Sequence, residues 1–146
     1  MKRIEQLQLL SKEHHQSLTL GQKAIKISQQ GDQDAIAELC LKIVSEYSTV
    51  WKIHFKIEED SIFTPYANRS PDIEQMCQQL SHEHQLLDDY YQQMKLGDYG
   101  VLEAFGSLLK QHTRTEERQL FPLLESVLTP EELDRVYQTS CNYRNN

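Results

Sequence analysis

Short polar breaks divide the chain into four long segments in which apolar residues recur every three or four positions. This spacing is typical of helices that bury one face and expose the other to water. We predict helices from about Ile4 to Gln30, from about Asp34 to Phe63, from Ser70 to Gly97 and from about Tyr99 to Pro122. Four such helices with short links predict an all-α fold, an antiparallel up-and-down four-helix bundle.

The breaks carry residues that start or end helices. Gly31 suits a helix C-terminus, and Asp32 can cap the helix that follows. Ser70 is followed by proline, which combines a capping hydroxyl with proline at the first helical position. Pro65 opposes a simple continuation of the second helix. Pro122 is expected to kink or end the fourth helix unless the missing hydrogen bond is tolerated.

A short extra helix is predicted at the C-terminal end. Residues 129–132 read Thr-Pro-Glu-Glu, which fits a capping box with proline at the first helical position. Leu133, Val136 and Tyr137 can then pack back on the bundle, and residues 142–146 are expected to fray. Because no low-complexity tract or linker divides the chain, we expect residues 1–146 to form a single domain.

Composition narrows the function classes. A formal charge of −7 and a pI near 5.3 provide no basic surface for nucleic acid. No segment approaches the roughly 20 apolar residues of a membrane span, and the start lacks the apolar stretch of a signal peptide. The three cysteines, Cys40, Cys77 and Cys141, are scattered and form no disulfide framework or metal knuckle. A reducing cytoplasm is the expected location.

One stretch of the sequence is written twice. Residues 54–63 read HFKIEEDSIF and residues 112–121 read HTRTEERQLF, and each copy is followed closely by proline. In both copies a histidine precedes a glutamate by four positions, as His54 precedes Glu58 and His112 precedes Glu116. Side chains four apart project from the same helix face, so each pair can reach one metal ion, or its carboxylate can bridge two.

A second repeat relates the first and third helices. Residues 10–14 read LSKEH and residues 80–84 read LSHEH, which selects His14 over His15 and His84 over His82. A competing alignment pairs His15 with His84, so His15 stays open at this level. The apolar stripe favours His14, because it stands four residues after one buried-face leucine and four before another.

Four helices thus offer six inward ligands: His14, His54, Glu58, His84, His112 and Glu116. A single histidine in an apolar stripe is usually an ordinary hydrogen-bonded core residue. Here every stripe contains one, and burying two carboxylates without partners costs several kcal/mol each. A pair of divalent metal ions would balance them. Imidazole and carboxylate ligands suit iron, zinc or manganese, and iron best fits an open site that exchanges electrons with oxygen.

This pattern resembles the hemerythrin family, in its branch with a His-His-Glu cation-binding domain. The family's block of histidine, acidic pair and Leu-Phe-Pro is matched by residues 112–122, and less closely by the first copy, which has one extra residue before its proline. The resemblance implies a non-haem centre of two iron ions, oxo- or hydroxo-bridged. It further implies bridging carboxylates at Glu58 and Glu116 and terminal ligands at His14, His54, His84 and His112.

Two features depart from the oxygen-carrying members of the family. The carriers have a fifth histidine four residues from another on the third helix, whereas Leu80 and Asp88 flank His84 at that spacing. The last carboxylate also follows His112 by four residues and not by five. Asp88 is either a further oxygen ligand or a solvated residue. We expect a more symmetric centre, which puts reversible oxygen carriage in doubt.

The favoured hypothesis is a cytoplasmic di-iron protein that binds oxygen or another diatomic ligand, or senses oxygen or redox state. The alternatives are iron delivery, repair of iron–sulfur centres, and a metal-free helical interaction module. No nucleophile–base pair or phosphate loop indicates catalysis, although a two-metal hydrolase stays open. Four aromatic residues are either ordinary core or the wall of an apolar pocket beside the metal: Trp51, Phe55, Tyr91 and Phe105.

Overall fold

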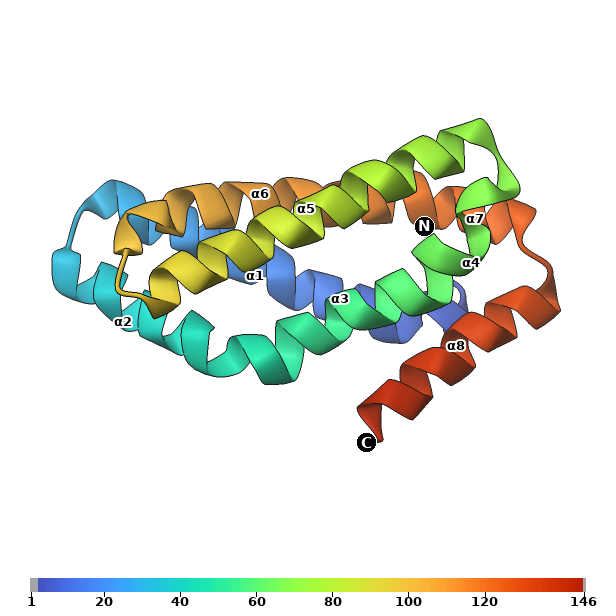
Figure 1. Cartoon of the computed structure of the whole chain (residues 1–146), viewed down its shortest axis with the longest axis horizontal. Coiled ribbons are helices and arrows are strands. Elements are labelled where there is room, and N and C mark those ends of the chain that lie inside the picture. The colour runs from blue at the N-terminus through green and yellow to red at the C-terminus, as the bar shows by residue number, and fades with distance from the viewer. Residues whose placement is uncertain (1–2, 146) are drawn as a thin grey trace.

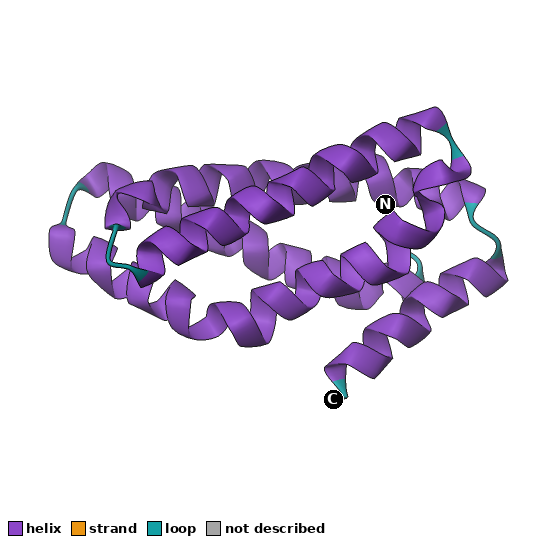
Figure 2. Cartoon of the chain, in the orientation of Figure 1, coloured by secondary structure: helices purple, strands orange, loops and turns teal. Residues whose placement is uncertain are grey.

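A computed structural model describes residues 3–145, which form helices and short connections without a strand (Figures 1 and 2). The first long helix joins a 3₁₀ turn, η1 (Glu5–Leu7), to α1 (Gln8–Gln30). The second runs through α2 (Gln33–Glu46), a π turn η2 (Tyr47–Trp51), α3 (Lys52–Glu58), a second π turn η3 (Glu59–Phe63) and α4 (Thr64–Tyr66). A 3₁₀ turn, η4 (Ala67–Arg69), leads to the third helix, α5 (Pro71–Lys95).

The fourth long helix begins after a 3₁₀ turn, η5 (Tyr99–Val101). It consists of α6 (Leu102–Thr115), a π turn η6 (Glu116–Leu120) and α7 (Phe121–Val127), and the short α8 (Pro130–Arg144) follows. Figure 1 shows the four long helices running alongside one another, with α8 lying obliquely across one end. The predicted four-helix bundle with an extra C-terminal helix is confirmed.

The predicted caps are present. Gly31 has a positive φ of 77°, and the Asp32 carboxylate accepts hydrogen bonds from the backbone of Asp34 and Ala35. Ser70 Oγ accepts from the backbone N–H of Ile73 at 3.2 Å. Thr129 and Glu132 form a complete capping box. The α2, α5 and α8 helices therefore each begin where a side chain satisfies unpaired backbone N–H groups.

Pro65 and Pro122 both lie inside helices, which differs from the expectation for Pro65. The second helix continues through Pro65 to Tyr66, and the fourth continues through Pro122 to Val127. A π turn precedes each proline, ending at Phe63 in one copy and at Leu120 in the other. Because a π turn already interrupts the regular hydrogen-bond ladder, the missing proline N–H is tolerated.

The first and fourth helices approach each other closely at two glycines. A Cβ on Gly106 would lie 2.7 Å from Ala24 Cβ and 2.8 Å from the backbone oxygen of Gly21. Beyond His14, the buried residues of α1 are small: Ser17, Gly21 and Ala24. Leu18 is only half-buried, although the apolar pattern placed it inward. Close contact between two backbones, more than bulky apolar residues, joins these two helices.

Two apolar clusters lie on either side of a polar layer. One gathers residues near the N-terminal end of α1 and the C-terminal ends of the second and fourth helices, such as Leu10, Ile62 and Leu120. The other gathers residues such as Ile43 and Phe105 toward the opposite ends. The predicted ligands occupy the middle of each helix, between the two clusters.

The C-terminal helix packs on the bundle through Leu133 and Val136, as predicted. Tyr137 was expected to join them but is 39% exposed, because it follows Val136 on the outer side of α8. The expected fraying is also wrong for residues 142–144, which are helical, and Arg144 pairs with Glu13. Asn146 lies outside the described residues. None of the helices in residues 3–145 is both long and apolar enough to cross a membrane.

Candidate metal centre

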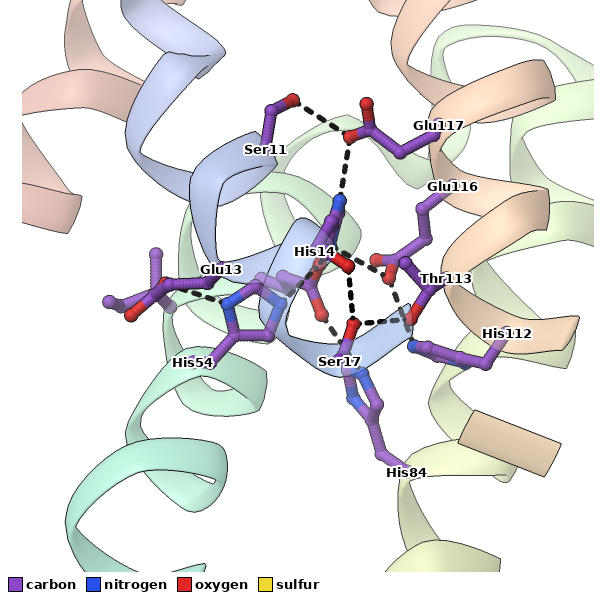
Figure 3. A network of polar contacts seen from close by, with 12 residues as sticks. Ser11, Glu13, His14, Ser17, His54, His84, His112, Thr113, Glu116 and Glu117 are labelled. Carbon is purple, nitrogen blue, oxygen red and sulfur yellow. Dashed lines mark hydrogen bonds and ion pairs between the residues drawn. The ribbon is translucent and has the colours of Figure 1, made fainter. Parts of the chain in front are cut away.

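All six predicted ligands meet in the polar layer at the middle of the bundle, and all are buried (Figure 3). Their ligand atoms form two groups, in each of which the atoms lie within 4.8 Å of one another. One group is His14, His54, Glu58 and Glu116; the other is Glu58, His84, His112 and Glu116. The two glutamates belong to both groups, so the layer is suited to two metal ions that share two carboxylates.

The Nε2 atoms of the four imidazoles face the two central carboxylates. Glu58 Oε2 lies 3.0 Å from His14 Nε2 and 3.2 Å from His54 Nε2, and Glu58 Oε1 lies 3.1 Å from His84 Nε2. Glu116 Oε1 lies 3.2 Å from His14 Nε2 and 3.1 Å from His112 Nε2. Glu58 thus presents one oxygen to His14 and His54 and the other oxygen to His84.

A carboxylate lies at the Nδ1 atom of every one of these imidazoles. His54 Nδ1 is 2.8 Å from Glu13, and His112 Nδ1 is 2.8 Å from Glu83. His14 Nδ1 is 2.6 Å from Glu117. A neutral imidazole that donates its Nδ1–H to such an acceptor keeps the Nε2 lone pair for a metal.

The fourth pair joins His84 Nδ1 to Glu59 at 2.9 Å. Serine hydroxyls donate to two of the outer carboxylates at 2.8 Å, Ser11 to Glu117 and Ser81 to Glu59. These serines, histidines and carboxylates occupy matching places in the two sequence repeats. The site therefore has an approximate twofold arrangement of its inner and outer polar groups.

Each Glu-Glu doublet supplies one carboxylate to the centre of the site and one to the Nδ1 atom of an imidazole. Each doublet lies at the junction of a regular helix with a π turn, η3 after Glu58 and η6 from Glu116. Adjacent residues on a helix point about 100° apart, so the first glutamate faces the centre while the second reaches a neighbouring helix. Glu59 reaches α5, and Glu117 reaches α1.

Aromatic rings that belong to the two apolar clusters pack against the imidazoles. The Phe63 ring lies 5.4 Å from the His84 ring, and its counterpart Phe121 lies 5.2 Å from the His14 ring. Phe55 stacks on His84 at 4.3 Å. At the position that corresponds to Phe55 in the second repeat stands Thr113, whose hydroxyl lies 2.8 Å from that of Ser17. The two halves match in their ligands but differ in the surrounding side chains.

The sequence matches the family model of the Hemerythrin HHE cation binding domain over residues 6–124. The chain belongs to this hemerythrin family. No curated protein and no solved structure matches it. The matched segment contains all six predicted ligands and ends before α8.

At the centre of this hemerythrin domain, the side chains that pair with Glu58 and Glu116 within residues 3–145 are all histidines. Burial alone lowers the pKa of His112, but the Glu116 charge and the hydrogen bond to Glu83 raise it to about 10. Burial likewise opposes a charge on His14, whose pKa Glu116, Glu117 and Glu58 nevertheless raise well above its usual value. Burial raises the pKa of Glu58, but His54 and His14 outweigh it and hold that pKa well below normal.

The central polar atoms fit a cation better than they fit one another. Both oxygens of Glu116 and the Nε2 atom of His112 are buried without a hydrogen bond, and the 3.1 Å contact between these residues lacks hydrogen-bond alignment. Within residues 3–145, no lysine or arginine pairs with Glu58 or Glu116. Buried carboxylate oxygens and imidazole nitrogens that face one another in this way are the ligand types that iron, zinc or manganese takes.

The structure also decides between the candidates that the sequence left open. His15 and His82 are exposed, so His14 and His84 are the inward histidines of this hemerythrin domain. Asp88 is half-buried in a surface hollow beside His84 and Glu59 and belongs to neither ligand group. Of the aromatic residues, Phe55 contacts the site, whereas Tyr91 stacks on Tyr47 in the core.

Sequence reasoning missed the four outer carboxylates: Glu13, Glu59, Glu83 and Glu117. Each was visible in the repeats, as the residue before the histidine in Ser-x-Glu-His or as the second residue of the Glu-Glu doublet. That repetition was the available signal. Spacing along one helix could not indicate their role, because each carboxylate serves a histidine on another helix.

Proposed function

We propose that this chain is a non-haem di-iron protein that binds oxygen or another diatomic ligand, or senses oxygen or redox state. In this proposal His14 and His54 hold one ion, and His84 and His112 hold the other. Glu58 and Glu116 bridge the two ions. Two irons held in this way would supply one-electron chemistry at an open coordination position.

The observation that carries the proposal is the pair of four-residue groups that share Glu58 and Glu116 in a buried layer. Each ion would receive four protein donors, which leaves room for a small exogenous ligand. The four outer carboxylates fix the imidazole orientation, as outer partners do in histidine metal sites. Membership in a cation-binding family agrees with this interpretation.

The surroundings support a small ligand. Phe55, Phe63 and Phe121 pack against the imidazoles and exclude water from most of the layer. His84 is 7% exposed and borders a surface hollow whose walls include Glu59 and Asp88. A diatomic molecule approaching through this hollow would meet the edge of the site.

We also propose that residues 1–146 form one domain, since α8 buries Leu133 and Val136 in the same apolar cluster as the bundle. A reducing cytoplasm fits the cysteines, because Cys40, Cys77 and Cys141 are all free thiols.

The test is anaerobic reconstitution of the metal-stripped protein with ferrous iron, followed by exposure to air. We expect two irons per chain, near-ultraviolet charge-transfer absorption and a coupled ferric pair in the Mössbauer spectrum. His54→Ala should lose iron, whereas the matched control His15→Ala, which alters an exposed histidine, should retain two ions. Failure to bind two irons would refute the proposal and favour an interaction module. Labile iron that transfers to an apo acceptor would favour iron delivery or repair.

A further inference from the structure

The outer carboxylates of the two halves have different second partners. Glu13 and Glu83 occupy matching repeat positions, and each accepts from one imidazole Nδ1 at 2.8 Å. Arg144 also donates to Glu13 from both terminal nitrogens, at 2.6 Å and 2.7 Å. Glu83 instead accepts from the neutral amide of Gln79 at 3.1 Å. One carboxylate is paired with a full positive charge and the other is not.

The same inequality appears at the second pair of outer carboxylates. The Arg3 guanidinium lies 3.5 Å from Glu117 Oε1 and donates to the Glu117 backbone oxygen at 2.9 Å, while it also pairs with Glu125. Its counterpart Glu59 accepts from Ser81 and His84. Within residues 3–145, no lysine or arginine pairs with Glu59 or Glu83. Both guanidinium groups therefore serve the half that contains His14 and His54.

These arginines stand outside the segment that matches the family model, which spans residues 6–124. Arg144 is held firmly, because its Nε donates to the buried Ser140 and its helix is anchored by Leu133 and Val136. The C-terminal helix thus carries a charge to the edge of the metal centre. Its packing on the bundle aligns that charge with Glu13 and not with Glu83.

A carboxylate that accepts an imidazole N–H strengthens that imidazole as a metal ligand, because it draws the proton and leaves negative charge on the ring. A bidentate guanidinium withdraws charge from the same carboxylate. Glu13 is therefore a weaker acceptor for His54 than Glu83 is for His112. The positive charge of Arg144 also opposes a cation at the nearer position.

We propose that Arg144, assisted by Arg3, makes the two metal positions unequal, so that the His14 and His54 position binds its ion more weakly than the His84 and His112 position. Arg144 acts through Glu13 and is a positioning residue, not a ligand. This inference rests on the proposed two-metal site. It adds that a centre with symmetric ligands fills and empties in two steps.

The test is an equilibrium titration of the full-length, metal-stripped protein with Co²⁺, followed by visible absorption. Wild-type protein should bind two ions in two separated steps. Arg144→Gln should strengthen the weaker step by about 10-fold and leave the tighter step unchanged, since outer partners tune metal affinity on this scale. Arg144→Lys, which keeps the charge, should retain the wild-type separation.

The mirror variant Gln79→Arg supplies an independent test. Gln79 is exposed, so arginine fits there, and it would place a guanidinium beside Glu83. This variant should weaken the tighter step and leave the weaker step unchanged. Thermal unfolding of the metal-free protein shows whether Arg144→Gln is folded. If it is not, Gln79→Arg still tests whether a guanidinium beside an outer carboxylate weakens metal binding.

The outcomes separate this inference from the proposed function. Binding of no Co²⁺ would remove the two-metal site itself. Two ions bound with equal affinity, or equal weakening of both steps by Arg144→Gln, would overturn only the inequality. A change confined to the tighter step in Arg144→Gln would show that the assignment of the two positions is reversed and would likewise overturn it.

Discussion

The close approach of α1 and α6 should control both stability and the metal site. We consider Gly106→Ala, which adds one carbon at the contact. That Cβ would lie 2.7 Å from Ala24 Cβ and 2.8 Å from the backbone oxygen of Gly21. Non-bonded carbons normally pack about 3.5–4.0 Å apart, so the helices would have to separate by about 1 Å. Neither contacting group can rotate away, because one is backbone and the other is a Cβ.

The magnitude follows from two opposing terms. Overpacking a well-packed contact costs about 1–3 kcal/mol, and this contact belongs in the upper part of that range because it is rigid. Alanine is the better helix former by about 1 kcal/mol. The net loss of unfolding free energy should be about 1–2 kcal/mol. For a chain of this size the midpoint of thermal unfolding should fall by about 3–6 °C.

The assay is thermal and urea unfolding of the metal-free protein, with Ser107→Ala as control. Ser107 is the next residue on α6 but is exposed, so its substitution should change stability by less than about 0.5 kcal/mol. Gly106→Ala should also weaken metal binding, because α1 carries His14 and α6 carries His112. If Gly106→Ala proves as stable as wild-type protein, or more stable, the two helices do not approach as closely as the Gly106 contacts indicate.

Four further predictions concern the site and one of its outer carboxylates. Glu58→Gln should bind at most one ion by metal analysis, since Glu58 faces three imidazoles; two ions retained would contradict its bridging role. Phe55→Ala should lose about 3–5 kcal/mol in urea unfolding because it deletes a buried ring stacked on His84, and a loss below 1 kcal/mol would refute that packing. The pKa of His112 is raised to about 10 in the folded protein from 6.5, so its contribution to stability is complete below pH 6.5 and is lost as pH rises through 10. Thermal unfolding of the metal-free protein should therefore show stability that falls from pH 6.5 to 10. Metal affinity should rise over the same interval, because the ion displaces fewer protons. Stability that increases over this range would contradict the raised pKa of His112. The pKa of Glu13 is lowered to about 2, so its contribution is present above pH 4.5 and is lost as pH falls toward 2.

The sequence alone determined the helices and the six inward-facing side chains of the polar layer. Apolar spacing and capping residues are local properties, so Gly31, Asp32, Ser70 and Thr129 indicated where helices end and begin. A histidine and a glutamate four positions apart share a helix face whatever the helix packs against. Two such pairs, and one inward histidine in each remaining helix, were therefore predictable without knowledge of neighbours.

Only the tertiary structure decided how the helices meet. Glu13 precedes His14 in sequence but serves His54 on another helix, and Arg144 reaches Glu13 from a helix 131 residues away. The π turns that carry the chain through Pro65, and the contact of Gly21 with Gly106, also left no unambiguous pattern. Hydrogen bonding along one helix fixes the direction of a side chain, whereas the partner it meets depends on the rotation and separation of neighbouring helices, which packing sets.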